Sequence, residues 1–177
     1  GNPVNVPVNA GSATSYGFEA AINGQLADFL SIFANVGYVD ATFDDTDSDG
    51  NPQLFAGNRF RLQPEWTASA GFDFVQPVAN WAEAYLNVTW TFRSDIFFDD
   101  DNAAVAGLDL SAPDLHLVNL RVGLRELEES WQVEFYVNNL FDENYIIDAG
   151  NTGGAFGTPT FIAGPPRFYG FSVKGRF

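Results

Sequence analysis

The sequence predicts an all-β protein, an antiparallel up-and-down sheet that forms a segment of a transmembrane β-barrel. Three observations predict this fold class. Apolar and polar residues alternate in about seven segments, the clearest segment runs for about eleven residues, and short connections alternate with long ones between the segments. About eleven residues at roughly 3.3 Å each, tilted by about 45°, rise roughly 25 Å, which is the height of the apolar band of an outer-membrane barrel.

The clearest alternation lies in WAEAYLNVTWTFRSD, residues 81–95. Its even positions are apolar, as at Leu86 and Val88, whereas polar residues such as Asn87 take the odd positions. A period of two residues predicts a strand with one apolar and one polar face. The pattern is less regular where Phe33 falls on the polar face, and no segment has a convincing helical period. Strands are predicted in residues 15–26, 29–43, 66–74, 81–95, 116–125, 130–139 and 168–177.

The connections between the predicted strands alternate in length, which favours a barrel. In an up-and-down meander this alternation places every short turn at one end and every long loop at the other, as in outer-membrane barrels. A soluble β-sandwich is the alternative, because it also buries one face of each strand and has the same periodicity. The short links lie near residues 26–29, 76–81 and 125–130, and the long ones near 44–61, 94–114 and 139–165.

Composition excludes several classes of function. The formal net charge of -15 argues against binding to nucleic acid, which requires a basic surface. The chain has no cysteine, so it has neither disulfides nor thiol chemistry. Its single histidine, His116, has the parity of the outward face near a strand end and is expected at the membrane interface, not in a catalytic triad. The paired carboxylates lie in loops without a base or nucleophile at a recognisable spacing, so an enzyme is not expected.

Three motifs resemble one family. NNLFDENY (138–145), followed by Pro166-Arg167 and a closing strand that ends in Phe177, resembles the C-terminal end of TonB-dependent outer-membrane receptors. NAGSATSYGFEA (9–20) resembles the family's segment where an outer loop enters a strand, and GNRFRLQPEWTASAGFDF (57–74) resembles its Pro-Glu-x-Thr strand entry. The matches are spread over nearly the whole chain.

The resemblance implies a 22-stranded barrel filled by a plug domain, of which residues 1–177 would be the last third of the barrel, with the plug domain and earlier strands absent. It also implies partners: outer-membrane lipid, the plug domain and remaining strands, a TonB-type energy-coupling protein and the barrel assembly machinery. The protein is expected in the bacterial outer membrane with its long loops extracellular. In this family the terminal strand is also an assembly signal, here carried by Tyr169, Phe171, Val173 and Phe177.

The function that the resemblance implies is active transport. Such a receptor takes up a scarce ligand, such as an iron chelate, a vitamin or an oligosaccharide, with energy from the inner membrane. The alternative is a structural or adhesive outer-membrane barrel that closes only with further strands or with copies of itself, because an open sheet leaves backbone groups unpaired in lipid.

Two arginines and five aromatic residues are candidates for binding the ligand. Arg93 and Arg121 lie on the polar side of their strands and could bind an anionic ligand or the acidic face of a plug. They could equally pair with wall carboxylates such as Glu83, Asp95 and Glu134. Aromatic residues of the long connections could stack on a ligand or pack the loops together: Phe97, Phe98, Tyr145, Phe156 and Phe161.

One loop has the spacing of a calcium site. In DTDSDG, residues 45–50, Asp45, Asp47 and Asp49 could converge on one ion. The bidentate glutamate of an EF-hand is missing, since Ala56 takes the twelfth position. The alternative is an acidic, solvated loop tip. No other cofactor is expected.

Overall fold

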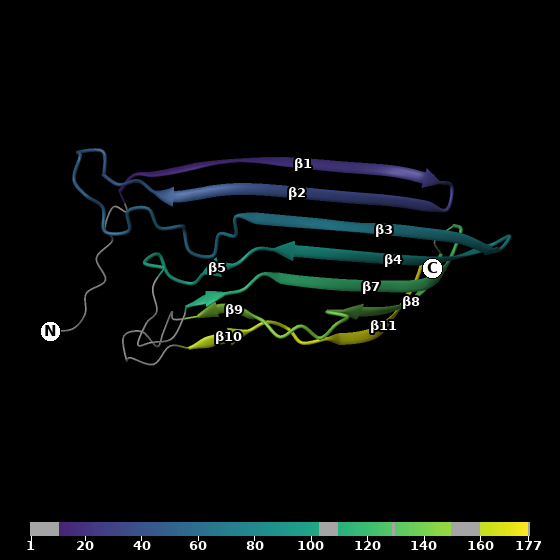
Figure 1. The fold of residues 1–177 in the computed structure, drawn as a ribbon. Helices are drawn as coiled ribbons and strands as arrows, with labels where there is room; N and C mark the ends of the chain where they lie inside the picture. Colours follow the sequence, from purple (N-terminus) through teal and green to yellow (C-terminus); the bar gives the residue numbers. More distant parts are fainter. Residues whose placement is uncertain (1–10, 103–109, 129, 150–159, 177) are drawn as a thin grey trace.

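The computed structural model describes residues 11–102, 110–128, 130–149 and 160–176. Seven long strands form one antiparallel sheet whose spatial order follows the chain, so the predicted meander is confirmed (Figure 1). Among the described residues no helix is long and apolar enough to cross a membrane. The strands of this sheet are β1 (Ala13–Ala27), β2 (Leu30–Phe43), β3 (Trp66–Ala79), β4 (Ala82–Arg93), β7 (Leu115–Glu126), β8 (Trp131–Asn138) and β11 (Phe168–Gly175).

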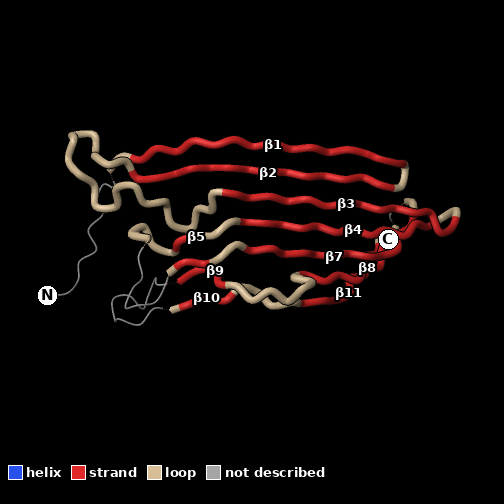
Figure 2. Tube along the Cα trace, in the orientation of Figure 1, coloured by secondary structure: helices blue, strands red, loops and turns tan. Residues whose placement is uncertain are grey.

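The connections are sorted by length as the sequence predicts. Short turns at one end of the sheet, called here the turn end, contain residues 28–29, residues 80–81, and residues 127–128 with 130. Figure 2 shows the long connections together at the opposite end, called here the loop end. Their described parts are residues 44–65, residues 94–102 with 110–114, and residues 139–149 with 160–167.

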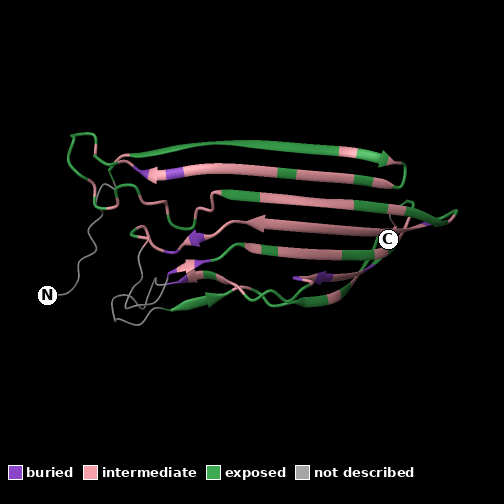
Figure 3. Ribbon diagram, viewed as in Figure 1, coloured by how far each residue is buried: buried purple, intermediate pink, exposed green. Residues whose placement is uncertain are grey.

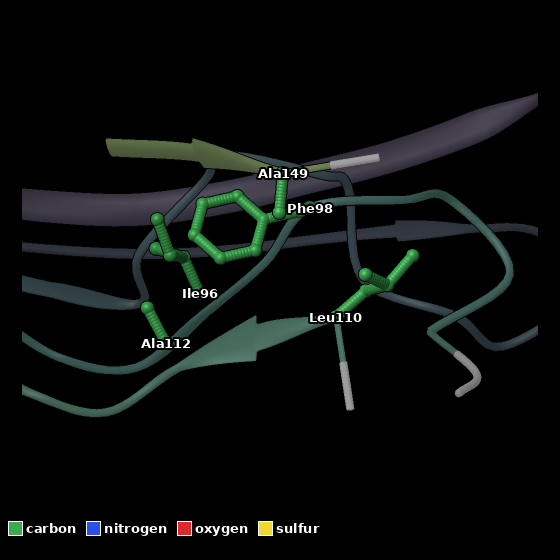
Figure 4. Close-up of a cluster of buried hydrophobic side chains, with 5 residues drawn as sticks. All are labelled: Ile96, Phe98, Leu110, Ala112 and Ala149. Atoms are coloured by element: carbon green, nitrogen blue, oxygen red, sulfur yellow. The ribbon is translucent and has the colours of Figure 1, made fainter. Parts of the chain in front are cut away.

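Two small hairpins within the long connections were not predicted. The strands β5 (Ile96–Phe97) and β6 (Ser111–Ala112) pair with each other, as do β9 (Ile146–Ala149) and β10 (Phe161–Ala163). Five side chains at the loop end, from Ile96, Phe98, Leu110, Ala112 and Ala149, form a buried apolar cluster that joins the two hairpins (Figure 4).

The strand register gives the large sheet two chemically different faces. Phe72, Val88, Leu120, Val137 and Tyr169 stand opposite one another across five strands, in one continuous apolar row. Side chains of successive residues point to opposite faces of a strand, so the next residue of each strand belongs to the other face. That neighbouring row contains Asp73, Asn87, Arg121, Tyr136 and Gly170. We call the two surfaces the apolar face and the polar face.

The apolar face is exposed, which distinguishes this sheet from a soluble sandwich. On β11, Phe171 is 77% exposed and Val173 is 76% exposed. Burial is concentrated near the loop end, as Figure 3 shows, and no second large sheet covers the apolar face within the described residues. Because a sandwich packs two sheets face to face over a core, the sandwich alternative is wrong for this part of the chain.

Aromatic rings on the polar face lie over glycines of the neighbouring strand. Phe33 stands opposite Gly71, and a methyl group on that glycine would lie 2.6 Å from the ring carbon Cε1. Tyr136 likewise stands opposite Gly170, where a methyl group would lie 2.6 Å from the tyrosine hydroxyl oxygen. Rings that cover cross-strand glycines restore the packing that a missing side chain leaves open. This contact explains why Phe33 departs from the alternation of its strand.

Candidate functional site

Ion pairs on the polar face join the wall strands. The guanidinium of Arg121 donates to the Glu134 carboxylate at 2.8 Å, and that of Arg125 donates to Glu83 at 2.6 Å. The Tyr85 hydroxyl donates to the second oxygen of Glu134 at 2.9 Å. Arg121 is therefore paired with a wall carboxylate, as the alternative interpretation predicts, and is not an unpaired cation for a ligand.

Arg93 is placed differently from Arg121. At the loop end of β4, its Nη1 donates to the carbonyl oxygens of Ser94 at 3.1 Å and Pro113 at 3.3 Å. No carboxylate of the described residues lies within ion-pair distance of it. Arg93 and Arg121 lie on the same face of the sheet. Odd-numbered residues of β4 stand opposite odd-numbered residues of β7, and the odd-numbered residues of both strands belong to the polar face.

Arg93 and Tyr145, two of the predicted ligand residues, line one pocket. The pocket has a volume of about 240 Å³ and lies between the ends of β4 and β7, the β6 segment and residues 143–146. Arg93, Asp114, Glu143 and Tyr145 supply its main polar groups. We call it the rim pocket. The structure thus brings together a cation and a phenol that are 52 positions apart in the sequence, counting from 93 to 145.

The other aromatic candidates have different surroundings. Phe98 is only 3% exposed and belongs to the buried cluster, so its surroundings match the alternative in which the ring packs the loops together. Phe97 lies beneath the Arg59 guanidinium, 5.3 Å from ring centroid to Cζ. Phe161 is 48% exposed on β10 and stays a candidate. Phe156 lies outside the described residues.

Arg59 is a structural residue that the sequence did not single out. Its Nη1 binds Asp95 at 2.8 Å, and its Nη2 donates to the Asp95 carbonyl oxygen at 3.1 Å. Close by, the backbone N–H of Leu62 donates to the Phe97 carbonyl at 2.7 Å. These bonds fasten the connection 44–65 to the connection 94–114. A guanidinium with both terminal nitrogens engaged on one residue is well suited to this task.

The carboxylates of the acidic loop, residues 45–50, do not converge on one point. Asp47 Oδ1 accepts hydrogen bonds from the backbone N–H groups of Asp49 at 2.9 Å and Asn51 at 2.8 Å. The backbone and side-chain N–H groups of Asn51 lower the pKa of Asp47. Within the described ranges no group of three or more acidic or histidine side chains could hold a metal ion, so Asp45, Asp47 and Asp49 do not converge as predicted. The tight turn at Gly50, with φ of 83°, instead uses Asp47 as its hydrogen-bond acceptor. Calcium binding stays a prediction.

The apolar face carries aromatic clusters near both ends of its strands. At the loop end Tyr38 and Trp66 lie 4.7 Å apart between ring centroids. His116 packs 4.9 Å from Phe92 there, and its Nδ1 accepts from Trp90 at 3.3 Å, so it belongs to this cluster and not to a catalytic triad. Rings at two heights with aliphatic side chains between them are typical of a strand wall that crosses a membrane. At the turn end the paired rings are Phe29 with Phe74 and Trp81 with Trp131.

The last strand presents its outward residues as predicted. Tyr169, Phe171 and Val173 are exposed on the apolar face of β11, which pairs with β8 on one side only. Phe177 lies outside the described residues. The role of this strand in barrel assembly stays a prediction.

Comparison with known proteins identifies the family. Residues 1–140 match the family model described as TonB dependent receptor-like, beta-barrel. The chain belongs to this family. Within it, the chain is 26% identical over 176 residues to the ferric-pyoverdine M114 receptor PbuA of Pseudomonas sp. (strain M114). The match covers 96% of this chain and 19% of that receptor, so the chain spans about a fifth of its relative's length.

Two solved structures of similar fold are a receptor and a transporter of ferric chelates. The ferric yersiniabactin uptake receptor FyuA from Yersinia pestis matches 93% of this TonB-dependent receptor chain, with a TM-score of 0.77 and 21% identity, over 24% of its own length. The unliganded ferric citrate transporter FecA matches 92%, with a TM-score of 0.72 and 23% identity, also over 24% of its length. At these identities the likeness shows the fold, which is that of the barrel wall.

Proposed function

We propose that this chain forms part of the wall and outer loops of an outer-membrane receptor that takes up a ferric chelate, with energy delivered by a TonB-type protein. The observation that carries the proposal is the two-faced sheet, with an exposed apolar face between aromatic clusters and a polar face crossed by ion pairs. Lipid covers the first face, and the second lines the interior. Membership of the family and the ferric-pyoverdine receptor among its relatives support the choice of cargo.

The sheet edges support the proposed partners. Within the described residues, β1 and β11 each pair on one side only, which leaves a row of backbone N–H and C=O groups without strand partners. Each such group costs several kcal/mol in hydrocarbon. Further barrel strands therefore pair with both edges, a plug domain packs against the polar face, and the barrel assembly machinery recognises β11. The long connections then face the cell exterior.

Iron uptake by the full-length protein tests the proposal. Cells that lack their own ferric receptors receive the full-length gene and are supplied with radioactive iron as complexes of citrate, a hydroxamate, a catecholate and a pyoverdine. We expect saturable uptake of at least one complex, and an uncoupler that collapses the proton-motive force should abolish it.

Two controls separate this function from its alternatives. Cells with the empty vector report background uptake, and surface labelling of the outer loops reports whether the barrel is present in the outer membrane. A correctly inserted barrel that transports none of the complexes would refute the receptor and leave a structural wall. Transport that continues unchanged after uncoupling would refute energy coupling.

A further inference from the structure

The rim pocket contains a cation whose charge the described residues leave unpaired. Arg59, Arg121 and Arg125 each form an ion pair at 2.8 Å or less, whereas Arg93 contacts only carbonyl oxygens. Its Nε and Nη2 groups have no hydrogen-bond partner among the described residues. A guanidinium is planar and always charged, and it binds a carboxylate through two parallel N–H groups. Arg93 therefore offers donors to a ligand in the pocket.

Nearby carboxylates do not use Arg93 as a partner. Asp95 is bound by Arg59 at 2.8 Å, and Asp114 lies 3.2 Å from the Nε2 atom of His116. Neither acid lies within ion-pair distance of Arg93, although the charges of both act on its guanidinium. An incoming anion does not have to displace an existing salt bridge from Arg93.

Tyr145 supplies a second donor. The Tyr145 ring lies against Gly164, where any side chain would collide with the ring. The backbone N–H of Gly164 donates to the backbone carbonyl oxygen of Tyr145 at 2.8 Å. The glycine therefore allows the ring its position. The Tyr145 hydroxyl has no hydrogen-bond partner within the described part of the chain. A guanidinium and a phenol on one pocket form a donor pair for an oxyanion.

The pocket walls are fixed by the buried cluster. Ala112 lies in both the pocket wall and the cluster, and Ile146 lines the pocket while it packs against the same cluster. Phe98, at the centre of that cluster, is 3% exposed. Side chains set by packing lose little entropy when a ligand binds, which favours a preformed site.

The volume of the rim pocket limits the size of the ligand group that it can bind. At about 240 Å³ it is smaller than the roughly 300–1,000 Å³ of pockets that enclose a whole drug-sized ligand. It therefore fits one group of a larger molecule. Glu143 and Asn144, which also line the pocket and are exposed, can accept from a hydroxyl or amine next to that group.

We propose that the rim pocket binds a carboxylate group of the incoming cargo, with Arg93 as its ion-pair partner and the Tyr145 hydroxyl as a second donor. The proposal rests on the proposed function and adds a chemical class to it: a chelate that carries a free carboxylate beside a hydroxyl or amine. The pocket holds this group at the loop end of the wall, before the cargo meets the ion-paired polar face.

Binding of citrate to the purified full-length protein tests the pocket without knowledge of the native cargo. Saturation-transfer NMR in detergent measures the affinity for citrate and for its neutral triamide. We expect wild type to bind citrate and not the triamide, and Arg93→Gln to bind citrate about tenfold to a hundredfold more weakly, as for loss of a charge-assisted hydrogen bond. Tyr145→Phe should weaken binding severalfold, and Arg93→Lys should retain part of the affinity.

A matched control isolates the pocket. Arg61→Gln removes another loop arginine, whose nearest carboxylate is Asp100 at 3.9 Å and which does not line the pocket. It should bind citrate as wild type does. Far-UV circular dichroism of each variant checks that the barrel is folded. Equal citrate affinity in wild type and folded Arg93→Gln, or no saturable binding by wild type, would overturn the proposal. If citrate binding depends on Arg93 while no ferric complex is transported, the pocket stands and the receptor function fails.

Discussion

An arginine at Val88 should destabilise the protein strongly, because Val88 lies on the apolar face between the two aromatic clusters, two residues from Trp90. It is four residues from Phe92 and six from Ala82 along β4. With a rise of about 3.3 Å per residue and a tilt of about 40°, those separations correspond to roughly 10 Å and 15 Å across the membrane. Val88 is thus close to the midplane, where an outward arginine costs about 2–4 kcal/mol.

Matched variants on the same strand test both the face and the depth. Thr89→Arg places the same side chain one residue further on, on the polar face, and should change the free energy of unfolding by less than about 1 kcal/mol. Phe92→Arg places it at the height of the aromatic cluster, where the cost falls to about 0–1 kcal/mol. The order of the three costs therefore reports which face meets lipid.

Equilibrium unfolding of the full-length protein in lipid vesicles provides the measurement. Urea titrations followed by tryptophan fluorescence give the free energy of unfolding for wild type and each variant. A larger loss for Thr89→Arg than for Val88→Arg would show that the faces are assigned the wrong way round. Equal losses for Val88→Arg and Phe92→Arg would show that the apolar face does not contact a hydrocarbon layer.

Three further variants test local features of the structure. Phe98→Ala should cost about 3–5 kcal/mol of local stability, since that ring is buried, and hydrogen exchange should rise in both small hairpins while the long strands stay protected. Gly170→Ala should destabilise the wall by displacing the Tyr136 ring, and a double-mutant cycle with Tyr136→Ala should recover most of the loss in urea titrations. Because hydrogen bonds from Asn51 lower the pKa of Asp47, the loop is favoured above the unfolded-chain pKa of about 3.9 and loses order as pH falls through the lower folded-state pKa. An NMR titration of the Asn51 amide should show that transition, and Asp47→Asn should remove it.

The long strands could be predicted because the alternation of apolar and polar residues is visible within each strand's own sequence. A strand such as β4 alternates over its twelve residues, and that local pattern needs no knowledge of its neighbours. Phe33 is the instructive exception. Its place on the polar face is explained by Gly71 on the next strand, a contact between residues 38 positions apart, counting from 33 to 71, that becomes visible once the register is known.

The loop end could not be predicted in the same way. Strands β5 and β6 have two residues each, too short for a period of two to be recognised. The burial of Phe98 and the bond between Arg59 and Asp95 both depend on which long connections lie side by side. The rim pocket is an intermediate case: the sequence nominated Arg93 and Tyr145 separately, and tertiary structure placed them on one cavity.

The scarcity of cations determines where this wall can attract an anion. Eight Lys and Arg residues stand against 23 Asp and Glu, so the whole chain repels anions at long range. That repulsion is screened beyond about 8 Å at physiological ionic strength, and an anionic group that reaches the loop end responds to its immediate neighbours. On the polar face, Arg121 and Arg125 are paired with Glu134 and Glu83, which reduces the attraction of these two arginines for a further anion. If the proposed function holds, Arg93 at the rim meets a carboxylate of the cargo before that group reaches the ion-paired part of the polar face.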